Sequence, residues 1–183
     1  MRAIVTACRG GHVPAEPAVL ISNNRESAAL TWARETGLPA CHISAKTTGS
    51  DAAADAAIAQ ALNDHNVDLV VLSGYMRKLG PATLAAFKGR ILNVHPALLP
   101  KFGGHGMYGA RVHEAVLAAG DCETGATIHS VDGEYDQGPI LAQARVPVEP
   151  GDTPDTLAAR VQAKELELYP ETLRRMIAGE IGD

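Results

Sequence analysis

The stretch that decides the fold is Val-Asp-Leu-Val-Val-Leu-Ser, at residues 67–73. Its aliphatic and β-branched side chains are almost uninterrupted, which is typical of a strand buried in a parallel sheet. We predict an Ala-rich helix directly before it, over Asp51–Asn66, because Ala54, Ile58 and Leu62 recur at helical spacing. A helix followed by a buried strand indicates an α/β fold.

The same alternation continues on both sides of this stretch. We predict further strands and helices, in chain order, at Pro17–Ser22 (strand), Arg25–Thr36 (helix), Pro39–Ser44 (strand), Pro81–Phe87 (helix), Arg90–His95 (strand) and Gly109–Ala119 (helix). Alternating strands and helices imply crossover connections and therefore parallel strands.

The last third of the chain departs from this alternation. Thr127–Val131 and Ile140–Val148 are two predicted strands without a helix between them, so we expect an antiparallel pair at one edge of the sheet. Asp152–Gly179 is predicted as one long helix or two abutting helices, with Tyr169-Pro170 as the break. The predicted fold class is thus α/β: a Rossmann-like, mainly parallel sheet with flanking helices and an antiparallel strand pair at one edge.

Composition narrows the function classes. The chain has 183 residues, 46% hydrophobic and 20% charged, with a formal net charge of −5. We expect a single domain over residues 1–183, and the apolar content excludes a disordered protein. The acidic balance without basic runs argues against nucleic acid as a partner, and no apolar run is long enough to span a membrane. Cys8, Cys41 and Cys122 form no disulfide framework, so we expect a reducing, cytoplasmic setting.

Candidate site residues follow the predicted strands, where α/β folds place their sites. Asn93 and His95 are two residues apart on one strand, so their side chains share a face. His95 is a natural general acid or base, Asn93 can donate to an oxyanion, and Asp136 can orient and charge an imidazole. From spacing alone, a turn-capping Asn93, a structural His95 and an Asp136 in a solvated turn are favoured.

Other catalytic signatures are absent from the sequence. There is no Gly-x-Ser-x-Gly elbow and no Walker A motif, and no cysteine lies in the signature of a nucleophile. His105, His113 and His129 lack the spacing of metal ligands, so we expect no metal.

Several motifs in combination resemble the phosphoribosylglycinamide formyltransferases, the folate-dependent enzymes of purine synthesis, over nearly the whole chain. The motifs are Ser73-Gly-Tyr-Met-Arg-Lys-Leu79, Ile91-Leu-Asn-Val-His-Pro-Ala-Leu-Leu-Pro100, Gly104-His-Gly-Met-Tyr-Gly109, Gly125-Ala-Thr-Ile-His129, Tyr135-Asp-Gln-Gly-Pro-Ile140, and Arg160-Val-Gln162 with Glu165. The Asn-x-His-Pro-x-Leu-Leu-Pro string followed by Asp-x-Gly-Pro-Ile is highly specific, and it outweighs the structural interpretation of Asn93 and His95.

The resemblance implies formyl transfer from 10-formyltetrahydrofolate, as co-substrate, to the amine of glycinamide ribonucleotide. It implies that Asn93 and protonated His95 hold the oxyanion, and that Asp136 raises the pKa of His95 and assists proton transfer. Gln162 and Glu165, three apart on one helical face, would bind the ribose hydroxyls. The folate would be bound by Met76, Arg77, Lys78, Leu79, Asn93, Gly133, Glu134, Tyr135 and Asp136. The chain is expected to act as a monomer or homodimer.

The N-terminus departs from the family pattern. Family members begin with a strand and a Gly/Ser/Asn-rich loop that holds the substrate phosphate, whereas Met1–Ala7 resembles the last turns of the helix that follows that loop. The alternative is a strand at Ala3–Thr6 with an anion loop at Arg9–His12; we favour Gly10-Gly11 as a helix C-cap, since few residues remain for a parallel crossover. We therefore expect either a reading frame that starts late or a degenerate paralogue.

Three functional hypotheses follow from the sequence. The first is the formyltransferase just described. The second is another enzyme that uses 10-formyltetrahydrofolate, and the third is a non-catalytic or altered-substrate folate-binding paralogue without a phosphate site.

Overall fold

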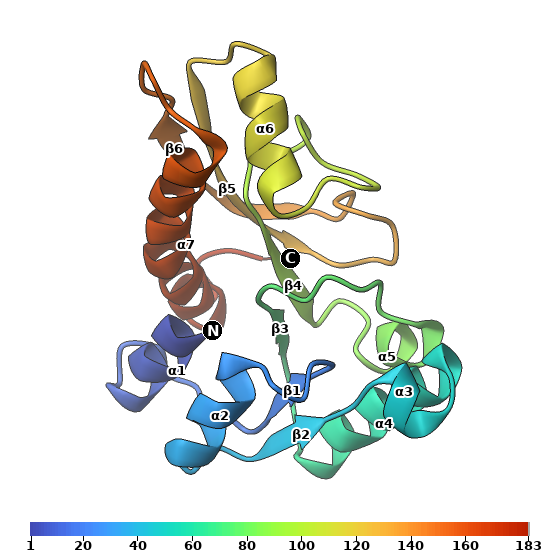
Figure 1. The fold of residues 1–183 in the computed structure, drawn as a ribbon. Helices are drawn as coiled ribbons and strands as arrows, with labels where there is room; N and C mark the ends of the chain where they lie inside the picture. The colour runs from blue at the N-terminus through green and yellow to red at the C-terminus, as the bar shows by residue number, and fades with distance from the viewer. Residues whose placement is uncertain (183) are drawn as a thin grey trace.

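The structure is a computed structural model that describes residues 1–182, and its strands form two separate sheets (Figure 1). The strands are β1 (Leu20–Ser22), β2 (Ala40–His42), β3 (Val70–Leu72), β4 (Ile91–His95), β5 (Glu123–Ser130) and β6 (Ile140–Pro147). β1 pairs with β2 in parallel, and the second sheet has the order β3-β4-β5-β6. In it β3 and β4 are parallel, whereas β4–β5 and β5–β6 are antiparallel. The predicted α/β class with an antiparallel pair at one edge is confirmed.

Seven helices flank these strands within the described residues: α1 (Arg2–Arg9), α2 (Ala28–Glu35), α3 (Ala45–Thr48), α4 (Asp51–Asp64), α5 (Pro81–Ala86), α6 (Ala110–Ala118) and α7 (Pro154–Ile177). All but α3 lie where the sequence predicts helix. α3 is a single short turn that begins and ends with local signals, a Ser44 capping box and a left-handed Gly49.

α7 is one continuous helix, so the predicted break at Tyr169-Pro170 is wrong. Pro170 lacks an N–H and leaves the carbonyl of Leu166 without its helical partner, but Leu166 is exposed and water can bond to that carbonyl. Tyr169 and Pro170 are themselves buried, and the Tyr169 hydroxyl donates to the carbonyl of Leu72 (3.1 Å). Tertiary packing therefore outweighs the local penalty of the proline.

The N-terminal segment is helical, which excludes the alternative strand at Ala3–Thr6. α1 ends at Gly10, whose N–H bonds to the carbonyl of Thr6, and Gly11 follows with a left-handed φ of 76°. Gly10-Gly11 is thus the predicted helix C-cap, and α1 packs against α7 (Figure 1).

β3 is less buried than its sequence predicts. Val70, Val71 and Leu72 are only half-buried, although residues 67–73 are the most strand-like in the chain. One edge of β3 pairs with β4, but its other edge pairs with no strand of residues 1–182, and the outer edge of β1 is likewise unpaired. An unpaired edge leaves backbone groups and side chains accessible, which explains the exposure.

β4 lies between two apolar layers, because its side chains alternate between the faces of the sheet. Leu92 packs with Ile128 of β5 and with Tyr169 of α7. Ile91 packs on the other face with Ile58 of α4 and Phe87 after α5. Asn93 and His95 follow Ile91 at intervals of two, so they extend from the face opposite α7 at the carboxyl end of β4.

Candidate active site

Two polar side chains face each other across the β4–β5 ladder. Asn93 of β4 is directly opposite His129 of β5, and His95 is opposite Thr127. The Nδ2 atom of Asn93 lies 3.2 Å from Nε2 of His129. The sheet register therefore sets the position of Asn93 relative to His129, since opposed residues of an antiparallel pair are close neighbours.

Asp136 reaches the same point from the loop between β5 and β6. It has a left-handed φ of 56°, and its Oδ2 accepts a hydrogen bond from the N–H of Gly104 (2.9 Å). Oδ2 lies 3.4 Å from Nδ1 of His95, and Oδ1 lies 3.5 Å from Nε2 of His129. One carboxylate thus stands between two buried imidazoles.

Gly138 allows this loop to close. A Cβ at residue 138 would lie 1.9 Å from the carbonyl oxygen of Ser130, which no side chain tolerates. The N–H of Ser130 in turn bonds to the carbonyl of Pro139 (2.9 Å). The close approach needs glycine and returns the chain to β6 directly after Asp136.

His95 is held at both ring nitrogens. Its Nε2 lies 2.8 Å from the carbonyl oxygen of Phe102, and its Nδ1 faces Asp136. Burial lowers the pKa of His95, and the Asp136 carboxylate and the Phe102 carbonyl oppose this shift only in part. The expectation that Asp136 raises this pKa is right for the carboxylate's own effect, but desolvation outweighs it.

Asp136 is ionised at neutral pH. Burial acts to raise its pKa, but the contact with the His129 side chain, the hydrogen bond from the Gly104 N–H and the charge of a protonated His95 outweigh burial and lower the pKa. A carboxylate that stays charged beside an imidazole stabilises the imidazolium when His95 gains a proton.

The two segments expected to bind folate lie side by side. Nζ of Lys78 lies 3.9 Å from Oε1 of Glu134 and 5.3 Å from the ring centroid of Tyr135. Met76 and Tyr135 are exposed, whereas Leu79 is buried in the cluster that contains Phe87. Leu79 is thus a core residue.

Two further residues, Arg77 and Gly133, were expected in the folate-binding segments. Arg77 points to Asp51, with 2.7 Å between Nη1 and Oδ1. Gly133 follows Asp132, whose carboxylate accepts from the N–H of Glu134 (3.2 Å). The loop at residues 132–135 is therefore shaped by its own backbone, and Arg77 lies outside the Lys78–Tyr135 contact.

Gln162 and Glu165 are not hydrogen-bonded to the group around Asp136. No described hydrogen bond joins either residue to Asn93, His95 or Asp136. Gln162 is exposed, and Glu165 is half-buried in a small cavity that Ser73 also lines. Burial raises the pKa of Glu165, and the nearby ammonium group of Met1 opposes that shift.

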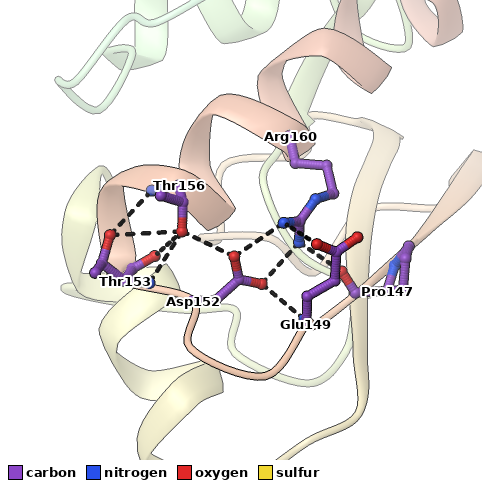
Figure 2. A network of polar contacts seen from close by, with 6 residues as sticks. All are labelled: Pro147, Glu149, Asp152, Thr153, Thr156 and Arg160. Atoms are coloured by element: carbon purple, nitrogen blue, oxygen red, sulfur yellow. Dashed lines mark hydrogen bonds and ion pairs between the residues drawn. The ribbon is translucent and has the colours of Figure 1, made fainter.

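A polar network fixes the start of α7, the helix that carries these two residues (Figure 2). The guanidinium of Arg160 donates to both carboxylate oxygens of Asp152 (2.7 and 2.9 Å) and to the carbonyl of Pro147 (2.9 Å). Arg160, the N–H of Glu149 and the Thr156 hydroxyl hold the pKa of Asp152 well below its usual range. Arg160 thus has a structural role at the β6–α7 junction.

Sequence reasoning missed one member of the site, His129. It is 2% exposed and contacts both Asn93 and Asp136, yet the sequence assigned it no catalytic role and raised it only as an unsupported metal ligand and as the last residue of a family motif. The β4–β5 register could have identified it, but that register is not visible in the sequence. Within residues 1–182, no group of three His, Cys, Asp or Glu side chains is arranged to hold a metal ion.

The comparisons with known proteins agree on the family. The model of the family described as formyl transferase matches residues 1–173. The chain belongs to the formyl transferase family. None of the helices in the described part of the chain combines the length and apolar character needed to cross a membrane.

Named relatives cover most of the chain. It is 36% identical to the phosphoribosylglycinamide formyltransferase of Haemophilus influenzae, over 99% of this chain and 83% of that protein. It is 42% identical to the chloroplastic phosphoribosylglycinamide formyltransferase of Arabidopsis thaliana over 94% of this chain, but spans only 59% of that protein. The crystal structure of glycinamide ribonucleotide transformylase 1 from Symbiobacterium toebii has a TM-score of 0.91 and 41% identity, covering 97% of this chain and 82% of that chain.

Proposed function

We propose that this member of the formyl transferase family transfers the formyl group of 10-formyltetrahydrofolate to the amine of glycinamide ribonucleotide, a step of purine biosynthesis. The observation that carries the proposal is the convergence of Asn93, His95 and Asp136 at the carboxyl end of β4. The names of the relatives support the same reaction.

In the proposed reaction the amine nitrogen attacks the formyl carbon, and the carbonyl electron pair moves to oxygen. An N–H of Asn93 stabilises this oxyanion, as preorganised donors do in acyl transfer. The Asp136 carboxylate, whose Oδ2 faces Nδ1 of His95, passes the proton that the attacking nitrogen must lose to the neutral His95 ring, the form that burial favours.

Although burial favours the neutral ring, the hydrogen-bond acceptors around His95 match the protonated ring better than the neutral one. The imidazolium donates Nε2–H to the Phe102 carbonyl and Nδ1–H toward Asp136, whereas a neutral ring serves only one of the two. The cation then assists Asn93 at the oxyanion and returns the proton to N10 as the bond between N10 and the formyl carbon breaks. The products are tetrahydrofolate and the formylated amine.

We propose that the folate lies against residues 76–79 and 132–136. Lys78, Glu134 and Tyr135 contact one another there, and Met76 and Tyr135 offer exposed apolar surface to an aromatic ring system. Gln162 and Glu165 are proposed to bind the ribose hydroxyls of the other substrate.

The remaining parts of the proposal concern the whole chain. We propose one domain over residues 1–183 that acts on small molecules as a monomer or homodimer. The three cysteines are free, in keeping with the reducing cytoplasm expected from the sequence.

A binding titration paired with a transfer assay tests the function. The folate inhibitor analogue 5,8-dideazafolate is titrated, and formyl transfer from 10-formyltetrahydrofolate to glycinamide ribonucleotide is then followed. We expect the analogue to bind, and we expect the protein to transfer one formyl group for each 10-formyltetrahydrofolate consumed. Binding without transfer would instead support a non-catalytic folate-binding protein, and transfer to other amines alone would support a different formyltransferase.

A further inference from the structure

His129 has contacts that the proposed reaction does not explain. Its ring is 2% exposed, its Nδ1 lies 2.9 Å from the carbonyl oxygen of Ser130, and its Nε2 lies 3.2 Å from Nδ2 of Asn93. We infer that His129 is a positioning residue that orients the side-chain amide of Asn93. For its effect on catalysis, this inference rests on the proposed function.

The Ser130 carbonyl selects the tautomer of His129. A carbonyl oxygen only accepts hydrogen bonds, so Nδ1 at 2.9 Å must carry the proton. In the neutral ring Nε2 is then a lone-pair acceptor, and the group in front of it is the N–H of Asn93. The backbone of β5 thereby turns Nε2 into an acceptor for Asn93.

This acceptor settles which way the Asn93 amide points. With Oδ1 turned toward Nε2, two lone pairs would face each other, so Nδ2 must face His129. An amide nitrogen carries two N–H groups, and the second remains free for an oxyanion. Among the described residues the Asn93 side chain has no other hydrogen-bond partner, so His129 alone fixes this orientation.

Asp136 marks the competing arrangement. Its Oδ1 is 3.5 Å from the same Nε2. If Nε2 carried a proton, it would donate a hydrogen bond to this carboxylate and could not accept one from Asn93. Asp136 already receives the N–H of Gly104 at 2.9 Å and faces Nδ1 of His95 at 3.4 Å. The shorter contact to Asn93 and these other partners favour the arrangement with an unprotonated Nε2.

Nuclear magnetic resonance tests the orientation without any activity. Long-range 1H–15N spectra of wild-type protein labelled with 15N in histidine report at neutral pH which ring nitrogen of His129 carries the proton, and a second sample labelled in asparagine reports the side-chain amide of Asn93. We expect the Nδ1–H tautomer, together with an Asn93 side-chain amide whose two protons exchange at different rates. A proton on Nε2 of His129 would overturn the inference, whether or not the protein transfers a formyl group.

A double-mutant cycle tests the catalytic consequence. His129→Leu removes the acceptor and should lower kcat roughly 10²-fold, the scale of misplacing a catalytic group by about 1 Å. His129→Gln puts an amide oxygen near the position of Nε2 and should restore much of kcat. His65→Leu, at the end of α4, is the control and should leave kcat unchanged.

Combining His129→Leu with Asn93→Ala distinguishes an effect of His129 that acts through Asn93 from a general effect on the structure. If His129 works through Asn93, adding His129→Leu to Asn93→Ala should lower kcat no further than Asn93→Ala alone. Independent, multiplying effects of the two substitutions would contradict the inference. If wild-type protein shows no transfer, the proposed function fails, and the tautomer measurement still decides the orientation.

Discussion

Thr127 ties the turn after His95 to the sheet. Its hydroxyl donates to the carbonyl of Ala97 (2.6 Å) and accepts from the N–H of Leu99 (3.1 Å) and from Nε2 of Gln143 (2.9 Å). The residue is fully buried, so water cannot replace these partners. We predict that Thr127→Val lowers the free energy of unfolding by roughly 1–3 kcal/mol, the cost of leaving a buried polar group unpaired, as measured by urea denaturation.

Thr124 offers a matched control on the same strand. It is also buried, but its hydroxyl has no hydrogen-bond partner among residues 1–182. Thr124→Val removes a polar group that gains nothing from burial, so the unfolding free energy should stay unchanged or rise. A loss as large as that of Thr127→Val would show that the hydrogen bonds of Thr127 are not the cause.

The lowered pKa values of His95 and Asp136 predict that the protein loses stability in acid. The pKa of His95 is lowered from 6.5, and that of Asp136 from 3.8, in the folded state. The unfolded chain therefore binds protons before the folded one, and the unfolding free energy falls as pH drops below 6.5 and again below 3.8. His113, also buried with a lowered pKa, acts in the same direction as His95.

Urea denaturation between pH 8 and pH 5 checks this pH dependence, with His95→Gln as the comparison. The variant lacks one group that resists protonation, so its stability should fall less steeply over the same interval. Wild-type stability that rises on acidification would contradict the assigned pKa directions.

At the scale of elements, β3 and β5 differ in how their backbones are protected. β5 pairs on both edges, with β4 and β6, whereas β3 pairs only with β4 among residues 1–182. Because unpaired N–H groups exchange readily, β5 amides should exchange with deuterium more slowly than those of β3. Hydrogen–deuterium exchange measures this directly, and equal protection of Val71 and Ile128 would show that the second edge of β3 is covered.

The elements also show what the sequence can and cannot predict. Periodicity predicts nearly every helix and strand here, because burial of an apolar face leaves a local pattern. It fails at Pro170, where the packing of Tyr169 against β3 outweighs a local rule, and at β3, whose burial depends on its neighbours. His129 was missed for the same reason, since its role depends on a β4–β5 register that no local pattern encodes.

At the scale of the molecule, the proposed active-site group is assembled from three parts of the chain. β4 supplies Asn93 and His95, β5 supplies His129, and the loop before β6 supplies Asp136. The sequence predicted three of these four residues, through motifs that resemble the formyltransferase family, while residue spacing alone favoured structural roles for them. The proposed function therefore rests on how the sheet gathers these residues.

The most direct test of this account compares formyl transfer by wild-type protein and by His95→Ala. Exposed His12 provides the control variant His12→Ala, and thermal denaturation establishes that all three proteins are folded. We predict that wild-type and His12→Ala transfer the formyl group equally well, while His95→Ala loses roughly 10²–10⁴-fold in kcat, the range for a general base. A folded His95→Ala with wild-type kcat would contradict the account.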